Sequence, residues 1–247
     1  MTDVHERIRE FWDRDSHTYD DSSSHSVSDP LEAAAWRAAL RRSLPDAGAS
    51  ILDVGAGTGA LSILAAELGY HVTALDLSEG MLAKARAKAE VRQLDITFVV
   101  GQALEPPAGP FDAVIERHVV WTMPDPVAVL RAWHDVVTPG GRLVLFEGVW
   151  KPATPSDRMR VAAAEGLRKV RRNAAHHHAP YPDDVMAQLP LAGMSSPAPL
   201  IDAVHQAGWH ATRVERLRDI EWAVQVRERW PLGRLEHTAR YVLIADA

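Results

Sequence analysis

The hydrophobic pattern between residues 50 and 147 switches repeatedly between two periods. Short apolar runs occupy about 51–54, 72–75, 96–100, 111–116 and 142–146. Stretches with helical spacing lie between them, over about 59–68, 78–89 and 125–137. The run at 96–100 is continuous and largely β-branched, as expected of a strand that is covered on both faces. Strands that alternate with helices predict βαβ units, and therefore a parallel sheet with helices on both sides.

Two helical segments are expected before this core. Residues 3–13 place Val4, Ile8, Phe11 and Trp12 on one helical face. A second helix is expected from Asp29-Pro30, an N-cap followed by proline at the first helical position, to about Arg42. The polar residues between the two helices are typical of a mobile loop.

After residue 147 the alternation stops. Residues 150–195 contain one amphipathic helix over roughly 156–172, then His176-His177-His178 and a proline-rich stretch, so they predict an insertion over the site. A helix from Ser196-Pro197 to Gly208 and two late strands near 210–217 and 237–245 complete the pattern. We interpret the chain as a single domain with four parts. These are an N-terminal helical lid (1–45), a core (50–147), a helical cover (150–195) and a C-terminal helix with the last two strands (196–247).

Composition narrows the classes of function. The 27 Lys and Arg residues are outnumbered by 33 Asp and Glu residues, which argues against a nucleic-acid partner. The chain has no cysteine, which excludes disulfides, thiolate metal sites and a cysteine nucleophile. The N-terminus is too charged for a signal peptide, and no apolar run approaches the ~18 residues of a membrane span. We therefore expect a cytoplasmic protein without a membrane partner.

A glycine-rich loop carries the strongest chemical signal. Gly55-Ala56-Gly57-Thr58-Gly59 follows the first core strand and opens a helix, where backbone N–H groups and the helix dipole favour a ligand. Asp53 lies just before the loop, and Asp76 ends the next strand, where an acid can accept both ribose hydroxyls. This combination predicts a nucleoside cofactor. The spacing Gly55-x-Gly57-x-x-Ala60 also fits the loose dinucleotide fingerprint, so the loop alone does not separate S-adenosylmethionine (SAM) from NAD.

Further motifs resemble the class I SAM-dependent methyltransferases, in particular the small-molecule group called type 11 or type 25. The residues that carry the resemblance are Leu52 to Gly59, Val72 to Ser78 with Met81, Phe111 to Val114, and Thr138 to Leu143. They follow one another over about residues 50–147. An NAD enzyme is not expected to carry the last of these motifs. The resemblance implies a Rossmann-like, doubly wound α/β fold with a seven-stranded sheet in the order 3-2-1-4-5-7-6, strand 7 antiparallel, and a helical lid.

The resemblance also implies cofactor contacts. Asp76 would hold the ribose, Leu77 and Met81 would pack the adenine, and the glycines would lie against the methionine part. Gln102, followed by Ala103, stands where the family commonly has an acid for the adenine amino group, although an amide carbonyl can accept the same bond. The segment Phe11-Trp12-Asp13 with Tyr19-Asp20 resembles the family's lid. The full set of expected cofactor-binding residues is Tyr19, Asp53, Gly55, Ala56, Gly57, Gly59, Asp76, Leu77, Met81, Gln102, Ala103 and Arg117.

For the reaction, His118 is the candidate general base because it lies just beyond the fourth core strand and histidine titrates near neutral pH. The alternative is a cofactor or backbone contact. Glu116 and Glu147 end neighbouring strands and either face the pocket or cap it, and Trp121 is a candidate pocket wall. No metal site is expected, since three consecutive histidines rarely converge on one ion.

The predicted function is transfer of a methyl group from SAM to an O, N or C atom of a small-molecule acceptor by in-line displacement. Two alternatives stay open: an NAD-dependent Rossmann enzyme and a non-catalytic SAM-binding protein. The sequence does not identify the acceptor, and it leaves a homodimer open.

Overall fold

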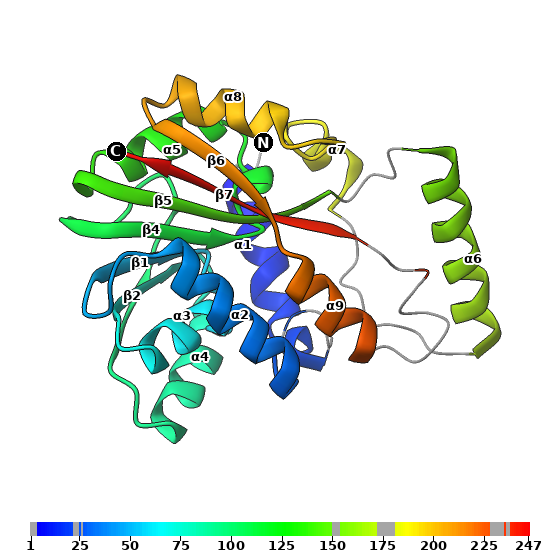
Figure 1. Ribbon diagram of the computed structural model, residues 1–247, viewed down its shortest axis with the longest axis horizontal. Coiled ribbons are helices and arrows are strands. Elements are labelled where there is room, and N and C mark those ends of the chain that lie inside the picture. Colours follow the sequence, from blue (N-terminus) through cyan, green and yellow to red (C-terminus); the bar gives the residue numbers. More distant parts are fainter. Residues whose placement is uncertain are drawn as a thin grey trace.

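The fold is built on one seven-stranded sheet with the order β3-β2-β1-β4-β5-β7-β6 (Figure 1). A computed structural model describes residues 4–21, 25, 27–149, 154–171, 181–227, 235 and 238–247. The strands are β1 (Ser50–Val54), β2 (His71–Asp76), β3 (Ile96–Val100), β4 (Phe111–Arg117), β5 (Val137–Val149), β6 (His210–Arg216) and β7 (Ala239–Asp246). Neighbours among β1 to β5 pair in parallel, whereas β7 is antiparallel to both β5 and β6. The strand order and the antiparallel seventh strand expected from the resemblance are confirmed.

Helices cover both faces of this sheet (Figure 1). The longer helices are α1 (Val4–Asp15), α2 (Pro30–Ser43), α3 (Ala60–Glu67), α4 (Glu79–Val91), α5 (Pro126–His134), α6 (Pro155–Arg171), α8 (Ala198–Gln206) and α9 (Arg218–Arg227). Short helical turns are η1 (Tyr19–Asp21), η2 (Val120–Thr122) and α7 (Asp183–Met186). Among the described residues, no helix is both long enough and apolar enough to cross a membrane.

Capping residues fix where several helices begin. The Asp29 carboxylate accepts the N–H groups of the first turn of α2, and Ser78 accepts the N–H of Met81 in α4. Asp125 caps α5 in the same way, with Pro126 in the first helical position. Each of these starts follows directly from the sequence.

Two hydrophobic clusters lie on opposite faces of the sheet. One joins α2, α3, α4 and α9 to the sheet and contains Trp36 and Phe146, whose rings meet edge to face at 5.3 Å. The other joins α5 and α8 to the sheet and contains Trp133 and Trp209. Burial of one large apolar side chain contributes about 1.5–3 kcal/mol, so these clusters provide most of the driving force for folding.

A third cluster forms a lid at the edge where the parallel strands end. It joins Ile8 of α1 to Tyr181, Val185 and Leu189 around α7. Partly buried side chains complete it, including Phe11, Trp12, Leu77 and Trp121. Leu77 follows β2 and Trp121 lies beyond β4, so the lid rests on the carboxyl ends of the strands. Helix α6 stands on the same side of the molecule, beyond the end of β5 (Figure 1). The predicted histidines 176–178 of the cover lie outside the described residues.

Several boundaries differ from the sequence expectations. Helix α5 ends at His134, before the expected 137, because β5 already begins at Val137. The predicted turn Thr138 to Gly141 lies inside β5 as an irregularity, where pairing with β4 passes from Val137 to Arg142. In the segment expected to be a loop, α1 continues to Asp15 and η1 follows. Helices α7 and α9 were not predicted from the sequence.

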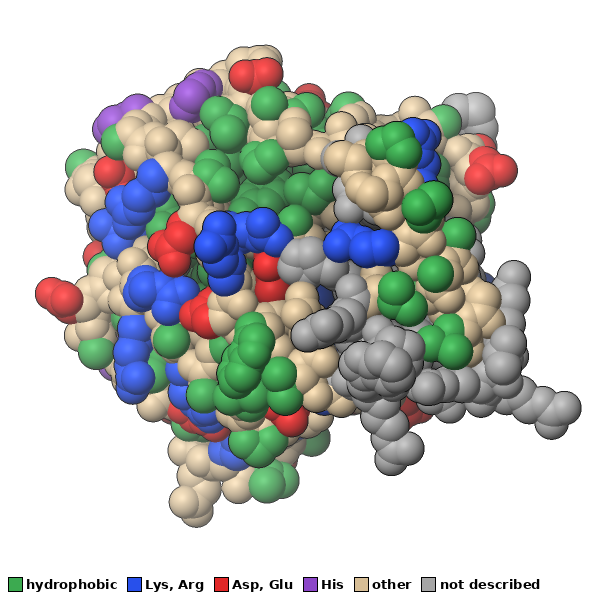
Figure 2. Space-filling view, turned by 45° about the vertical axis from the view of Figure 1, so that its right-hand side comes forward, with side chains coloured by type: hydrophobic (Ala, Val, Ile, Leu, Met, Phe, Trp, Pro, Cys, Tyr) green, Lys and Arg blue, Asp and Glu red, His purple; other side chains and the backbone are tan. Residues whose placement is uncertain are grey.

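On the face drawn in Figure 2, side chains of both charges are interspersed. Among the ion pairs of the described residues, the guanidinium of Arg42 in α2 lies 3.3 Å from a carboxylate oxygen of Glu215 and 3.0 Å from one of Asp219.

Candidate active site

The loop after β1 has a backbone that only glycine accommodates without strain. Gly55, Gly57 and Gly59 all have positive φ angles, of 65°, 56° and 83°. A Cβ atom on Gly55 would lie 2.2 Å from a methyl carbon of Val119, and one on Gly59 would lie 3.0 Å from the Cβ of Ala85. The sequence interpretation of these glycines as conformational requirements is therefore correct. The loop brings main-chain N–H groups to the start of α3, at the carboxyl edge of the sheet.

Asp76 is joined to this loop directly. Its Oδ2 accepts the N–H of Gly57 at 2.7 Å, and its Oδ1 accepts the N–H of Ser78 at 2.8 Å. Burial raises the pKa of Asp76 to about 6, against the lowering effect of backbone hydrogen bonds from Ser78, Gly57 and Leu77. Since a carboxylate has about four acceptor positions, Asp76 retains capacity for a further donor.

Asp53 lies beneath the loop. Its carboxylate is buried, and Oδ2 accepts the hydroxyl of Ser62 in α3 at 2.5 Å. Burial raises the pKa of Asp53 to about 7. The N–H of Ala56 donates to the carbonyl of Leu75 at 3.0 Å, so the loop is anchored to both β2 and α3.

The residues expected around an adenine lie near the ends of β2 and β3. Met81 is buried, and Leu77 packs against the lid cluster. Gln102 is exposed, while the carbonyl of Ala103 accepts the indole N–H of Trp133 at 2.7 Å.

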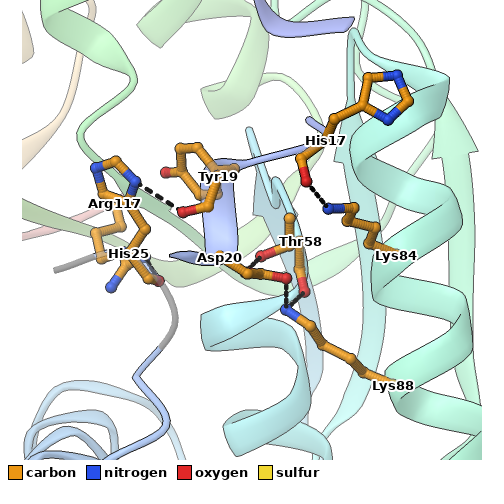
Figure 3. Close-up of polar contacts among 8 residues, drawn as sticks. All are labelled: His17, Tyr19, Asp20, His25, Thr58, Lys84, Lys88 and Arg117. Atoms are coloured by element: carbon orange, nitrogen blue, oxygen red, sulfur yellow. Dashed lines mark hydrogen bonds and ion pairs between the residues drawn. The ribbon is translucent and has the colours of Figure 1, made fainter. Parts of the chain in front are cut away.

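The N-terminal segment is fastened across the loop by polar contacts (Figure 3). Asp20 bridges two elements, since it accepts the hydroxyl of Thr58 at 2.7 Å and pairs with Lys88 of α4 at 2.8 Å. Lys88 also donates to the carbonyl of Thr58 at 3.0 Å, and Lys84 donates to the carbonyl of His17 at 2.9 Å. We call Asp20, Thr58 and Lys88 the latch. It joins η1 to the loop between β1 and α3 and to α4.

Tyr19 lies between the latch and β4. Its ring stacks on His25 with a centroid distance of 4.1 Å, and Arg117 donates to the carbonyl of His25 at 2.9 Å (Figure 3). Burial raises the pKa of Tyr19, while the charge of Arg117 opposes that shift. Nη1 of Arg117 is a buried donor that has no hydrogen-bond partner among the described residues. A buried guanidinium donor of this kind can bind an anionic group strongly.

A second group of polar side chains lies where β4 and β5 end. His118 has a φ of 64°, its N–H donates to the carbonyl of Phe146 at 3.2 Å, and its Nδ1 lies 3.3 Å from Oε2 of Glu147. Oε2 of Glu116 accepts the N–H groups of Val119 at 2.6 Å and Val120 at 3.4 Å, so Glu116 caps η2. The structure therefore brings together the three candidates that the sequence placed at this rim.

Burial and neighbouring charges shift the pKa values of this group. Burial raises the pKa of Glu116 to about 8. The pKa of Glu147 also lies well above its usual range, because of burial and the nearby charge of Glu116. The pKa of His118 lies well below its usual range, because of burial and the positive charges of Arg240 and Arg117. Perturbed pKa values clustered at a strand edge are typical of functional sites.

Two residues of this group were missed by the sequence analysis. Tyr241 lies opposite Glu147 in the register of β7, and burial raises its pKa. Arg240 is its neighbour, and burial lowers its pKa to about 10. Because β7 runs antiparallel, its first residues meet the last residues of β5. The strand order implied by the resemblance places β7 beside β5. Which residues of the two strands lie opposite each other is known only from their register in the structure.

No group of three or more His, Cys, Asp or Glu side chains suited to a metal ion occurs in the part of the chain that the structure describes.

Residues 52–145, which contain the loop and most of these side chains, match the family model of the methyltransferase domain. This match confirms the resemblance to the class I SAM-dependent methyltransferases. The matched residues run from within β1 to within β5 and include both Asp76 and His118.

Curated relatives agree with this assignment. The ubiquinone biosynthesis O-methyltransferase of Xanthomonas axonopodis pv. citri (strain 306) is 34% identical over 157 residues, which cover 61% of this chain and 64% of that protein. The protein of the same name from Ruegeria pomeroyi is 34% identical over 154 residues, 61% of each chain. The chain thus covers less than two thirds of the length of these relatives.

Solved structures share the fold across nearly the whole chain. Haemonchus contortus phosphoethanolamine N-methyltransferase 2, solved in complex with S-adenosyl-L-methionine, superposes with a TM-score of 0.64 and 19% identity over 97% of this chain and 59% of its own. The [4+2]-cyclase SpnF superposes with a TM-score of 0.67 and 16% identity over 98% of this chain and 96% of its own. At these identities the likeness concerns the fold alone.

Proposed function

We propose that this protein is a methyltransferase that transfers the methyl group of SAM to a small-molecule acceptor. The observation that carries the proposal is the direct bond between Asp76 and the N–H of Gly57. It joins the glycine loop and the acid of the next strand into one surface at the carboxyl edge of the sheet, where open α/β sheets bind ligands.

The residues of this edge fit an S-adenosyl group. Asp76 has an acceptor position left for a ribose hydroxyl, and the Gly55 and Gly57 backbones allow close approach of the methionine part. The buried Nη1 of Arg117, with Tyr19 beside it, would meet the carboxylate of that methionine. Leu77, Met81, Gln102 and Ala103 would surround the adenine, while Asp53, Ala56 and Gly59 would hold the loop in shape.

For the acceptor we propose a hydroxyl oxygen as the first candidate, since the 34%-identical relatives are named O-methyltransferases. The lid cluster contributes the aromatic side chains Phe11, Trp12, Trp121 and Tyr181, which would enclose a partly apolar molecule. Nucleic acid is an unsuitable acceptor for a chain with a net charge of -6.

SAM supplies an activated methyl group on a sulfonium centre, so the protein's tasks are alignment, exclusion of water and removal of a proton. The lid provides the first two. For the third we propose His118 as general base, since it lies beyond β4 at this edge with 24% of its side chain exposed.

The experiment is a transfer assay with methyl-labelled SAM and a panel of phenols, amines and carboxylates. We expect label in a phenol product, and a kcat on the order of 10²-fold lower in His118→Ala with little change in affinity for S-adenosylhomocysteine. His71→Ala, an exposed histidine at the start of β2, is the matched control and should keep wild-type turnover. Full turnover in His118→Ala would remove His118 from the mechanism.

A second candidate is a SAM-binding protein with another activity. The likeness to the [4+2]-cyclase favours keeping it, because one fold can host unrelated reactions. Binding of S-adenosylhomocysteine together with no labelled product from any acceptor class would support this candidate over methyl transfer.

A further inference from the structure

Arg240 is a buried cation at the start of β7. The residue is 8% exposed, and burial together with the charge of Arg117 lowers its pKa to about 10, so the guanidinium stays charged at neutral pH. Its backbone N–H donates to Oε1 of Glu221 at 2.8 Å, and its carbonyl accepts the N–H of Leu217 at 2.9 Å. Within the described part of the chain, the guanidinium itself makes no hydrogen bond or ion pair. Arginine is rarely buried without a paired anion.

The two carboxylates that attract Arg240 are each paired with a different arginine. Glu32 of α2 is fully buried and forms an ion pair with Arg227 of α9. The carboxylate oxygens of Glu221 lie 3.0 and 3.2 Å from Nε of Arg216. The charges of Glu32 and Glu221 favour the charged form of Arg240 without a direct bond to it. Three arginines therefore share two carboxylates, which leaves an excess of positive charge here.

The strand order places Arg240 beyond the proposed donor site. The donor contacts lie on β2, β1 and β4, from Asp76 through the glycine loop to Arg117. Strand β7 is two places further along the sheet than β4, with β5 between them. Arg240 therefore lies on the side of the donor where an acceptor has to approach.

The register shows a site without a side chain next to Arg240. On β5, the residue opposite Arg240 is Gly148, and glycine within a strand often marks the close approach of a ligand. Arg117 is in register with Phe146 and Phe146 with Val242, two residues after Arg240. Because side chains alternate along a strand, Arg117 and Arg240 lie on the same face of the sheet.

Arg240 is also close to the end of β4, where methyl transfer is proposed to occur. Its charge is the largest of the charge effects that lower the pKa of His118, ahead of that of Arg117. The side chain of His118 is 24% exposed, so a ligand can reach this part of the edge.

We propose that Arg240 binds an anionic group of the methyl acceptor, so that the acceptor is a phenol that also carries a carboxylate or a phosphate-like group. The inference rests on the proposed function and narrows its substrate class. Arg117 would serve the carboxylate of the donor, and Arg240 would serve the anion of the acceptor. Pairs between guanidinium and carboxylate are strong and directional, so this contact would orient the hydroxyl that receives the methyl group.

The first test compares charged and neutral ligands of nearly equal shape on the wild-type protein. Calorimetric titrations of protein saturated with S-adenosylhomocysteine would use 3- and 4-hydroxybenzoate, the corresponding hydroxybenzamides and the corresponding hydroxyphenylphosphonates. We expect at least one anionic compound to bind on the order of tenfold or more tightly than its amide, as a charge-assisted bond predicts. The better of the two anions identifies the carboxylate or the phosphate-like group. If no anion bound more tightly than its amide, the proposal would be overturned.

The second test assigns the preference to Arg240. We expect Arg240→Gln to lose the preference for the anion while its affinity for S-adenosylhomocysteine stays within about twofold, and Arg240→Lys to restore part of the preference. Arg142→Gln is the matched control, because Arg142 lies at the other end of the same strand pair, opposite Asp246. It should keep the preference.

Two other outcomes would overturn the proposal. One is an unchanged preference in Arg240→Gln. The other is a loss of S-adenosylhomocysteine affinity in Arg240→Gln with its circular dichroism unchanged, which would place Arg240 at the carboxylate of the donor. If the wild type bound no S-adenosylhomocysteine, the proposed function would fail, whereas the comparison of anion and amide on the ligand-free protein would still test Arg240.

Discussion

At the scale of single residues, the burial of Asp53 beneath the cofactor loop makes the stability of the folded state depend on pH. Its carboxyl is 2% exposed, bonded to Ser62, and has a pKa of about 7 instead of 3.8. Because the folded pKa is the higher one, the folded state holds a proton that the unfolded state has already lost. The contribution of Asp53 to stability therefore falls as the pH rises from about 4 through 7, and it levels off above the folded pKa.

We predict that Asp53→Asn weakens the pH dependence of stability between pH 6 and 8. With a folded pKa of about 7, Asp53 lowers the free energy of unfolding by about 1 kcal/mol over this interval, and an amide removes that contribution. Urea unfolding at both pH values measures the effect. If wild type and variant lose the same free energy between pH 6 and 8, the buried carboxyl is not the cause.

The cofactor loop could be recognised in the sequence because its backbone conformation requires glycine at specific positions. Glycine at three positions of one loop and an acid at the end of the next strand are local signals. Arg240 and Tyr241 left no such mark, since their place beside His118 and Glu147 depends on a strand pairing across about 90 residues. The bond from His118 to Glu147 likewise depends on tertiary geometry.

At the scale of elements, the N-terminal segment is joined to the core by the latch and by further hydrogen bonds, which include those from Lys84 to the carbonyl of His17 and from Arg117 to the carbonyl of His25. Asp20 is 24% and Lys88 is 32% exposed, so their ion pair is partly screened from water (Figure 3). Because the latch joins η1 to the end of the glycine loop, we expect it to open when the cofactor exchanges.

We predict that Asp20→Asn accelerates dissociation of S-adenosylhomocysteine on the order of tenfold, since it removes a charge-assisted contact from the closed state. Stopped-flow fluorescence of the tryptophans measures the rate. Glu79→Gln is the matched control. It disrupts the ion pair between Glu79 and Arg86, which lie on α4 together with Lys88, and it leaves the contacts of Asp20 unchanged. Equal dissociation rates in Asp20→Asn and wild type would mean that the latch does not control exchange.

Element boundaries were predictable where capping residues mark them, as at Asp29, Ser78 and Asp125. Helix α9 was missed because its apolar positions do not form one stripe: Ile220 is buried, whereas Trp222 and Val226 are each 56% exposed. The Thr138 to Gly141 segment has turn chemistry, yet it lies within a strand because β4 pairs on both sides of it. Tertiary pairing overrode local preference there.

At the scale of the whole molecule, the sheet order explains where the chemistry lies. The order β3-β2-β1-β4-β5-β7-β6 places the glycine loop, Asp76 and His118 along one edge, and the lid cluster lies above it. Dinucleotide-binding sheets have the order 3-2-1-4-5-6 without an antiparallel insertion, so the NAD alternative loses its structural support. A single domain, a cytoplasmic location and a homodimer stay predictions.

The central claim is that this edge binds the adenosyl donor, and calorimetric titration with S-adenosylhomocysteine tests it most directly. We predict saturable binding, weaker by about tenfold or more in Asp76→Ala because the ribose loses its acceptor, and no heat of binding with NAD. A wild-type protein that does not bind S-adenosylhomocysteine, or an Asp76→Ala variant with unchanged affinity, would contradict the account.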